Sequence, residues 1–495
     1  MTQTSVGPAV SDSVRAFLAR DHGVVIDGAA RPARSGQRFD VRDPATAEVV
    51  AHVARGGSAD VSDAVASAKR AFDDGRWRKI APARRGEILW RVADLLEASA
   101  EEFAELESAD VGRPLAQSRG MVAGSVTTFR YYAGWPTKLY GAVNPVGEHA
   151  LGYTVHEPVG VVGAIAPWNG PLAVAAAKIA PALAAGNTVV VKPAEEAPLS
   201  TLWLSELLLE AGVPPGVVNV VPGVGEEAGV ALVDHPDVPI ISFTGSTDVG
   251  KEIHRRVSDR LKRVNLELGG KTPSIVFADA NLDAAAQAAT SIWSNCGQVC
   301  FAGTRLLVQR EVASELAERV LGRSAKLSIG PGLDPSTEIG PLISASQLER
   351  VRRYLELGRA EGAGLALGGH VVDRPGYFVE PTIFTAVRNH HRIAQDEIFG
   401  PVLSILEFDE EDEALSIAND TRYGLAAAVW TSDLTRAHRA ARRLQAGTVW
   451  INAFGVLDRC FATGGFKESG IGREHGTAWI DEFTETKSVY VGLGE

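Results

Sequence analysis

The chain has 495 residues, of which 45% are hydrophobic and 22% charged, and its formal net charge is -12. This length exceeds one ordinary hydrophobic core and predicts two or three packed units. The acidic balance argues against nucleic-acid binding, because phosphate contact needs a basic surface. The most apolar helical segment, 171–186, contains Lys178 and Pro181 and is shorter than a membrane span, so no membrane association is expected.

The termini and the cysteines indicate a cytoplasmic protein. The N-terminal residues lack the basic start and apolar middle of a secretory signal. Three cysteines, Cys296, Cys300 and Cys460, fit a reducing compartment and form no disulfide framework. The 11 histidines show neither H-E-x-x-H nor zinc-finger spacing, and no metal site is predicted.

The first quarter of the chain predicts mixed local structure. Residues 1 to about 15 are expected to lack regular structure. Short apolar runs alternate with turn residues over 23–53, which favours a small antiparallel sheet. From Asp60 to Asp110 the apolar residues recur at helical spacing, which predicts successive amphipathic helices.

The middle of the chain has the rhythm of a parallel α/β sheet, with β-branched runs separated by helix-length segments. Gly186 and Gly212 stand where the helices should end. The alternation begins again after Lys271, which places a domain boundary near 267. The predicted strands are 159–167, 187–193, 217–223 and 239–245.

Two glycine-rich stretches are candidates for phosphate binding. The stretch 245–251 is close to a P-loop, but Glu252 replaces the Ser or Thr that would hold magnesium, which argues against an ATPase. A strand that ends at Gly245 and opens a helix at Ser246 or Thr247 still makes an anion site for a dinucleotide. The stretch 223–228 fits G-x-G-x-x-A, and a plain tight turn explains it equally well.

Glu195 follows the predicted strand 187–193 at the carboxyl edge of the sheet. A carboxylate at this point of a dinucleotide fold accepts hydrogen bonds from the adenosine ribose. It would also repel a 2′-phosphate, which favours NAD over NADP. The alternative is a solvated loop charge.

Cys300 is the candidate nucleophile, because Gly297 and Gly303 flank it and a thiolate adds readily to a carbonyl carbon. The alternative for an isolated cysteine in an apolar stretch is a packed core residue. Cys296 lies four residues earlier, so metal or redox chemistry is a further alternative, although the spacing is not C-x-x-C.

Seven motifs in register resemble the aldehyde dehydrogenase superfamily, over about residues 25–490. They are APWNGPL at 166–172, KPAEEAPLS at 192–200, FTGSTDVGK at 243–251, LELGGK at 266–271, GQVC at 297–300, EIFGPV at 397–402 and GGFKESGIGRE at 464–474.

The resemblance implies the catalytic roles. Cys300 would add to an aldehyde, and the Asn169 amide with the backbone N–H of Cys300 would stabilise the oxyanion of the thiohemiacetal. Glu267 would act as the general base that activates water to hydrolyse the thioester, with a buried structural carboxylate as the alternative. Lys178 matches a lysine that supports the active site, and a helix-surface charge is the alternative.

The resemblance also implies an NAD site and leaves use of NADP open. Lys192 and Glu195 resemble the ligands of the adenosine ribose, and Ser246 resembles the ligand of the pyrophosphate. Trp168 would line the cleft, and Glu397 and Phe399 would position the nicotinamide and its ribose. The neighbouring cofactor contacts are Ala166, Gly225, Gly245, Gly250 and Leu268.

Substrate preference is predicted from departures from the family pattern. Gly170 replaces a frequent aromatic residue, and Ala462-Thr463 replaces a Pro-Phe pair. A wide tunnel for a bulky aliphatic or aromatic aldehyde is the resulting hypothesis, and Arg459 is a candidate contact for an acidic substrate. The small lining candidates are Gly170, Val174, Ala177 and Val299, and the aromatic ones are Phe301, Phe454 and Phe461.

The predicted fold class is α/β, with a Rossmann-like cofactor-binding domain, a second α/β catalytic domain and a small β oligomerisation arm. The expected boundaries are 1–135 and 156–266 for the NAD-binding domain, 267–475 for the catalytic domain, and 136–155 and 476–495 for the arm. The arm, which the resemblance implies, would add to a neighbour's sheet edge in a homodimer or homotetramer.

Three other activities are weighed. A CoA-acylating dehydrogenase is disfavoured because Glu267 is a base suited to activating water. A cofactor-free thiol hydrolase would use Cys300 and Glu267 without NAD. A binding or structural protein would not need Cys300, Glu267 and Asn169 together.

Overall fold

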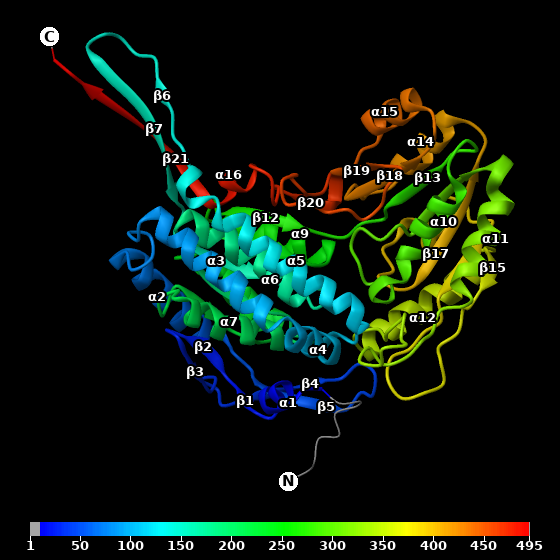
Figure 1. Cartoon of the computed structure of the whole chain (residues 1–495), viewed down its shortest axis with the longest axis horizontal. Coiled ribbons are helices and arrows are strands. Elements are labelled where there is room, and N and C mark those ends of the chain that lie inside the picture. Colours follow the sequence, from blue (N-terminus) through cyan, green and yellow to red (C-terminus); the bar gives the residue numbers. More distant parts are fainter. Residues whose placement is uncertain (1–9, 495) are drawn as a thin grey trace.

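The computed structural model describes residues 10–494 and contains two α/β units side by side, with a β-stranded arm that projects from the first (Figure 1). Residues 1–9, for which no regular structure was predicted, lie outside the described part. The same prediction is wrong from residue 12 onward, because Asp12–Leu18 forms helix α1. Its apolar residues Val14, Phe17 and Leu18 recur at helical spacing and are buried in the core of the first unit.

The first unit is built on an eight-stranded sheet whose central strands are parallel, as the sequence predicted. The strand order is β20-β12-β11-β8-β9-β10-β2-β3, and the pairings that involve β2, β3 and β20 are antiparallel. The strands are β2 (Val24–Ile26), β3 (Ala29–Arg31), β8 (Val161–Ile165), β9 (Thr188–Lys192), β10 (Val218–Val220), β11 (Ile240–Thr244), β12 (Arg263–Glu267) and β20 (Gly470–Ile471).

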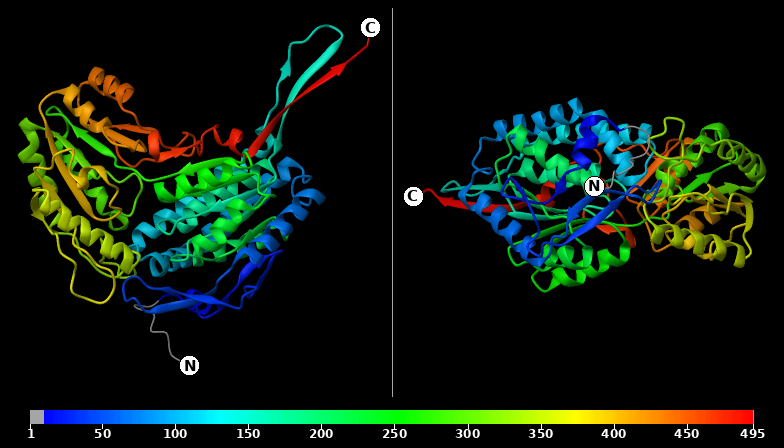
Figure 2. Two further views of the ribbon diagram at one scale, coloured as in Figure 1. Left: turned by 180° about the vertical axis from the view of Figure 1, so that it is seen from behind. Right: turned by 90° about the horizontal axis from the view of Figure 1, so that it is seen from below.

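Helices cover both faces of this sheet because its strands are apolar on both sides (Figure 2). Val189 and Val191 face one helical layer, whereas Val190 between them faces the other. The first layer contains α3 (Pro82–Ala98), α4 (Ala100–Val111), α5 (Leu115–Ala133), α6 (Pro171–Ala185) and α7 (Leu199–Ala211). The second layer contains α2 (Ser58–Asp74), α8 (Val230–Asp234) and α9 (Thr247–Ser258). No helix within residues 10–494 is long and apolar enough to cross a membrane.

The second unit is a seven-stranded sheet of order β15-β16-β17-β14-β13-β18-β19, parallel except for the β15–β16 pair. The chain passes from the first sheet to the second between β12 and β13, and it returns to the first at β20. The strands are β13 (Pro273–Val276), β14 (Arg305–Gln309), β15 (Gly364–Leu367), β16 (Thr382–Thr385), β17 (Val402–Phe408), β18 (Ala426–Trp430) and β19 (Thr448–Ile451). The helices are α10 (Leu282–Ala289), α11 (Ala313–Ser324), α12 (Ala345–Ala360), α13 (Arg392–Gln395), α14 (Glu411–Asn419) and α15 (Leu434–Arg443).

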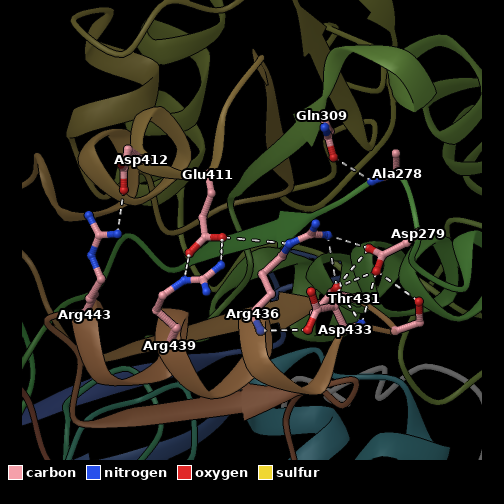
Figure 3. A network of polar contacts seen from close by, with 11 residues as sticks. Ala278, Asp279, Gln309, Glu411, Asp412, Thr431, Asp433, Arg436, Arg439 and Arg443 are labelled. Carbon is pink, nitrogen blue, oxygen red and sulfur yellow. Dashed lines mark hydrogen bonds and ion pairs between the residues drawn. The ribbon is translucent and has the colours of Figure 1, made fainter.

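Three arginines of α15 join this helix to neighbouring elements of the second unit (Figure 3). Most of these groups are partly exposed, and water and salt screen the attraction between such charges. The network therefore orients α15 more than it stabilises the fold. The pairs are Arg436 with Asp279, Arg439 with Glu411 and Arg443 with Asp412.

Two smaller sheets complete the structure. In one, β5 (Val49–Ala54) pairs antiparallel with β4 (Arg38–Arg42), as predicted for this region, but parallel with β1 (Asp21–His22). The other is the projecting arm, where β21 runs beside β7 with the C-terminus at its tip (Figure 1). Its strands are β6 (Val143–Asn144), β7 (Ala150–Pro158) and β21 (Thr484–Gly492), and α16 (Trp479–Phe483) leads into β21.

Asn187 joins three segments at the base of the arm. Its side chain is fully buried, accepts a hydrogen bond from the Gly160 N–H (3.0 Å), and donates to the carbonyls of Ala182 (3.2 Å) and Phe483 (2.9 Å). We expect Asn187→Ala to lower the free energy of unfolding by about 3 kcal/mol, because buried backbone groups lose their partners. Thermal and urea unfolding measure this loss. Exposed Asn144→Ala is the control, and equal losses in both variants would contradict the account.

Candidate active site

The loop that carries Cys300 has an unusual backbone. The helical turn Thr290–Gly297 ends with Asn295, Cys296 and Gly297 at φ values of 47°, 54° and 73°. A Cβ atom at Gly297 would collide with the carbonyl of Gly400. The loop therefore packs backbone against backbone, and Cys296 is buried beneath it in the core of the second unit.

The Cys300 thiol is half-buried, and its pKa is high. Burial, followed by the carboxylates of Glu397 and Glu267, raises the pKa of Cys300 to about 12, against the opposing effect of the Phe301 and Cys300 N–H groups. The thiol is consequently protonated at neutral pH, and it needs a base before it can act as a nucleophile.

Glu267, the last residue of β12, is the candidate base for this thiol. Its Oε1 is buried and has no hydrogen-bond partner among residues 10–494. Burial and the nearby Glu474 carboxylate raise the pKa of Glu267 well above its ordinary value, although Lys178 and Arg473 oppose the shift. A carboxyl group with a raised pKa and no partner is suited to taking up a proton.

Lys178 of α6 is not a helix-surface charge, because its side chain is fully buried. Its ammonium group donates to Ser242 Oγ of β11 (3.0 Å) and to Glu474 Oε1 (3.0 Å). Burial would raise the pKa of Glu474, but Lys178 and His475 outweigh that effect and lower it. The ion pair thus keeps one charged carboxylate close to Glu267.

Asn169 lies in the turn between β8 and α6, next to the Cys300 loop. Its amide Nδ2 donates to the carbonyl of Gln298 (2.9 Å), two residues before the thiol. Its own carbonyl accepts hydrogen bonds from Asn295 Nδ2 (3.3 Å) and from the guanidinium of Arg113. The sequence-predicted oxyanion amide and the nucleophile loop are therefore adjacent.

Arg113 and Glu107 form a buried ion pair that the sequence analysis missed. Their side chains are 2% and 0% exposed, with an Nη1 to Oε2 distance of 3.0 Å. Glu107 Oε1 accepts from the Leu172 N–H in the first turn of α6 (3.2 Å) and from Ser200 Oγ (2.7 Å). The pair holds the Asn169 turn from both sides. Its signal in the sequence was a glutamate among the apolar residues of the helix at 100–111, a segment that also contains the buried Asp110.

The predicted adenosine-ribose residues lie together beyond the ends of β9 and β10. Lys192 Nζ pairs with Glu195 Oε2 (2.7 Å), and the Gly225 N–H donates to Glu195 Oε1 (3.5 Å). Burial acts to raise the pKa of Glu195, but the Lys192 ammonium outweighs it and lowers the pKa. Glu195 is therefore an ionised acceptor and not a solvated loop charge, as a ribose ligand requires.

The predicted pyrophosphate region follows β11. Ser246 is exposed at the N-cap of α9, where its Oγ accepts from the Val249 N–H (3.4 Å). Helix α9 runs for 12 residues, so its N-terminus offers free N–H groups to an anion. One turn on, Gly250 leaves room for Leu268, since a Cβ atom there would collide with the leucine side chain. Gly245 precedes the N-cap.

The predicted nicotinamide residues contact one another. The rings of Trp168 and Phe399 meet edge to face, with centroids 5.2 Å apart, and Phe399 has a φ of 59°. Glu397 Oε1 accepts from the Gly270 N–H (3.2 Å), and only glycine fits at Gly269 beside this carboxylate. Ala166 is buried and donates its N–H to the Lys192 carbonyl (3.1 Å).

The predicted pocket residues differ in their surroundings and in their exposure. The ring of Trp450 packs against the rings of Phe301 and Phe454, with centroids 6.0 Å and 5.0 Å apart, respectively. Met121 of α5 lies beside Gly170, where a Cβ atom would be 3.4 Å from the Met121 methyl group. Phe461 stands apart, with 69% of its surface exposed. The half-buried positions are Val174, Ala177 and Val299.

Comparisons with known proteins show to which family the chain is similar. The model of the aldehyde dehydrogenase family matches residues 31–489. An aldehyde dehydrogenase of Enchytraeus buchholzi is 46% identical, covering 92% of this chain and 93% of its own. Human retinal dehydrogenase 2 is 45% identical, covering 95% and 92% respectively. The structure of a Bacillus cereus aldehyde dehydrogenase with NAD+ superimposes with a TM-score of 0.97 at 43% identity, covering 98% of this chain and 99% of that one.

The chain belongs to the aldehyde dehydrogenase family. It is an NAD-dependent aldehyde dehydrogenase, and NAD-dependent aldehyde oxidation is the general reaction of this family. The chemistry of the candidate residues suits the cofactor. An ionised carboxylate can accept from a ribose, an exposed helix N-terminus can bind a pyrophosphate, and an aromatic pair can contact a nicotinamide ring.

The pKa of Glu397 predicts a pH-dependent affinity of this aldehyde dehydrogenase for NAD. Burial raises that pKa to about 7, although the Gly270 N–H and Arg350 oppose it. The carboxylate gains its charge as the pH rises, and only the ionised form accepts two hydrogen bonds from ribose hydroxyls. We expect the dissociation constant of NAD to fall between about pH 6 and pH 8, as measured by fluorescence titration.

Glu397→Gln is the control, and its affinity should not change with pH. Lys271 loses its charge over the same range, because burial lowers its pKa to about 7. A pH dependence that survives unchanged in Glu397→Gln would assign the effect to Lys271 and contradict the prediction.

Proposed function

We propose that this aldehyde dehydrogenase oxidises a bulky aliphatic or aromatic aldehyde to its carboxylic acid through a covalent adduct on Cys300. The observation that carries the proposal is the meeting of three groups at one loop. These groups are the protonated thiol of Cys300, the carboxyl group of Glu267, whose Oε1 has no hydrogen-bond partner among residues 10–494, and the side-chain amide of Asn169.

Glu267 first takes the proton of the Cys300 thiol. The raised pKa values of both groups disfavour two neighbouring negative charges, so transfer of one proton leaves a single anion. Glu474 and Lys178 lie behind Glu267 and hold compensating charges. The thiolate then adds to the carbonyl carbon of the aldehyde, and the carbonyl oxygen becomes an oxyanion.

Asn169 Nδ2 and the Cys300 N–H stabilise this oxyanion. In the free protein the Asn169 amide donates to the Gln298 carbonyl, and Arg113 and Asn295 hold its backbone in place, so little reorganisation is needed. Bound NAD would supply the hydride acceptor, so that the adduct carbon is oxidised and a thioester on Cys300 remains. Trp168 and Phe399 limit the access of water to the reacting carbon.

Hydrolysis completes the reaction. Glu267 first releases the thiol proton to solvent. The Glu267 carboxylate then takes a proton from a water molecule whose oxygen adds to the thioester carbon, and the bond from that carbon to Cys300 Sγ breaks. The acid leaves and the thiolate is regenerated. A base for water favours this route over CoA acylation, in which a second thiol would receive the acyl group.

Small side chains and aromatic rings support a bulky substrate. Gly170 and Ala177 occupy little space on the α6 side, and Phe301 and Phe454 offer an apolar wall. The relative named retinal dehydrogenase 2 supports the same choice. The arm supports assembly into a homodimer or homotetramer, because it exposes apolar residues such as Tyr140, Val143 and Tyr490.

An aldehyde panel tests the proposal through NADH absorbance. Wild type should reduce NAD without CoA, and benzaldehyde or a long-chain aldehyde should give the highest kcat/KM. Cys300→Ala should lose at least about a thousandfold in kcat, because the nucleophile is absent, whereas Cys460→Ala should retain wild-type activity. An active Cys300→Ala variant would contradict the mechanism.

The same assay separates the alternatives. A CoA requirement would establish the acylating reaction, and ester turnover without NAD would establish the thiol hydrolase. A highest kcat/KM for acetaldehyde or a short charged semialdehyde would contradict the bulky substrate.

A further inference from the structure

The guanidinium group of Arg459 lies against one face of helix α5, and the same face extends toward Cys300 and Asn169. It belongs to the loop that follows β19, and its backbone is fixed by a hydrogen bond from the Gly476 N–H to the Arg459 carbonyl (2.9 Å). The side chain is half-buried, and its Nε donates to Thr128 Oγ1 (2.8 Å). Nη2 would lie 3.7 Å from a Cβ atom at Gly124, which is ordinary van der Waals contact, so the guanidinium lies against this part of α5.

Arg459 forms no ion pair among residues 10–494, and Thr128 is its one hydrogen-bond acceptor there, although the Glu474 and Asp458 carboxylates act on it at longer range. Two other buried arginines differ in this respect, because Arg113 pairs with Glu107 and Arg305 donates to three backbone carbonyls. Burial lowers the pKa of Arg459, yet the group stays a cation at neutral pH, and its two Nη groups still have donors to offer.

Helix α5 links this guanidinium to the oxyanion site. Met121, Gly124 and Thr128 share one face, because they are three and four residues apart. Met121 lies beside Gly170, which directly follows Asn169. At 1.5 Å per residue, Arg459 contacts the helix about 5–10 Å along its axis from Met121. That span corresponds to the length of a substituted benzene ring or a short alkyl chain.

We propose that Arg459 binds a carboxylate at the far end of the substrate, so that the preferred substrates are bulky aldehydes with a distal carboxylate. This inference rests on the proposed function and makes its substrate class narrower. The aldehyde end reaches Cys300 and Asn169, and the apolar body packs near Phe301 and Phe454. The two Nη groups of the guanidinium then match the two oxygens of a carboxylate.

A pair of aldehydes of nearly equal shape tests the inference. Wild type should have a higher kcat/KM for 4-formylbenzoate than for 4-methylbenzaldehyde. Arg459→Met should lower the ratio of the two values about tenfold or more, because a charge-assisted hydrogen bond is lost for one substrate only. Arg459→Lys should restore part of the ratio, and Arg353→Met, which removes an exposed arginine, should leave it unchanged. An unchanged ratio in Arg459→Met would overturn the inference.

Inhibition of wild type tests the same contact without a variant that has to fold. Terephthalate should compete with 4-formylbenzoate more strongly than 4-methylbenzoate does, and equal inhibition would overturn the role of Arg459. Low turnover of both aromatic aldehydes relative to acetaldehyde would overturn the bulky-substrate proposal and this inference with it. Good turnover of 4-methylbenzaldehyde with no effect of Arg459→Met would overturn this inference alone.

Discussion

The active site depends on close backbone contacts between loops that connect the strands of the two sheets. A Cβ atom at Gly270 would collide with the Cys300 carbonyl, and one at Gly297 would collide with the Gly400 carbonyl. These two contacts bring the Cys300 loop against the segment that follows Glu267 and against the loop that follows Glu397. The nucleophile, the predicted base and the predicted nicotinamide ligand are near one another because glycine leaves room for the approach.

Burial acts to raise the pKa values of the thiol and carboxyl groups in this site, but the outcome differs between them. Burial raises the pKa values of both Cys300 and Glu267, so the thiol is protonated at neutral pH and the Glu267 carboxylate is a stronger base than an exposed one. Glu474, by contrast, is paired with Lys178 and stays ionised. The site therefore holds exchangeable protons beside a fixed ion pair, an arrangement suited to moving one proton at a time without accumulating charge.

Much of this arrangement could be predicted from the sequence. The parallel strands of the first sheet were visible as β-branched runs, and the cofactor and the family followed from motifs. Local patterns could not show pairings between distant residues. Arg113 is 56 positions from Asn169, and Glu474 is 296 positions from Lys178, yet each pair is hydrogen-bonded. The exposure of Phe461 also depends on how its loop folds, which no local pattern reports. The domain boundaries and the individual residue roles stay predictions.

The most direct test of the account is to trap the covalent intermediate. Glu267→Gln should form the adduct more slowly than wild type, because the thiol has lost its base, and it should accumulate the adduct on long incubation, because glutamine cannot take a proton from the water that hydrolyses it. After incubation with benzaldehyde and NAD, mass spectrometry of digested protein should find a benzoyl group on the peptide that contains Cys300. The Cys296→Ala and Cys460→Ala versions of this variant should show the same modification at Cys300. A benzoyl group on another residue, or rapid turnover without any acyl-enzyme, would contradict the central claim that Cys300 is the nucleophile and Glu267 the base.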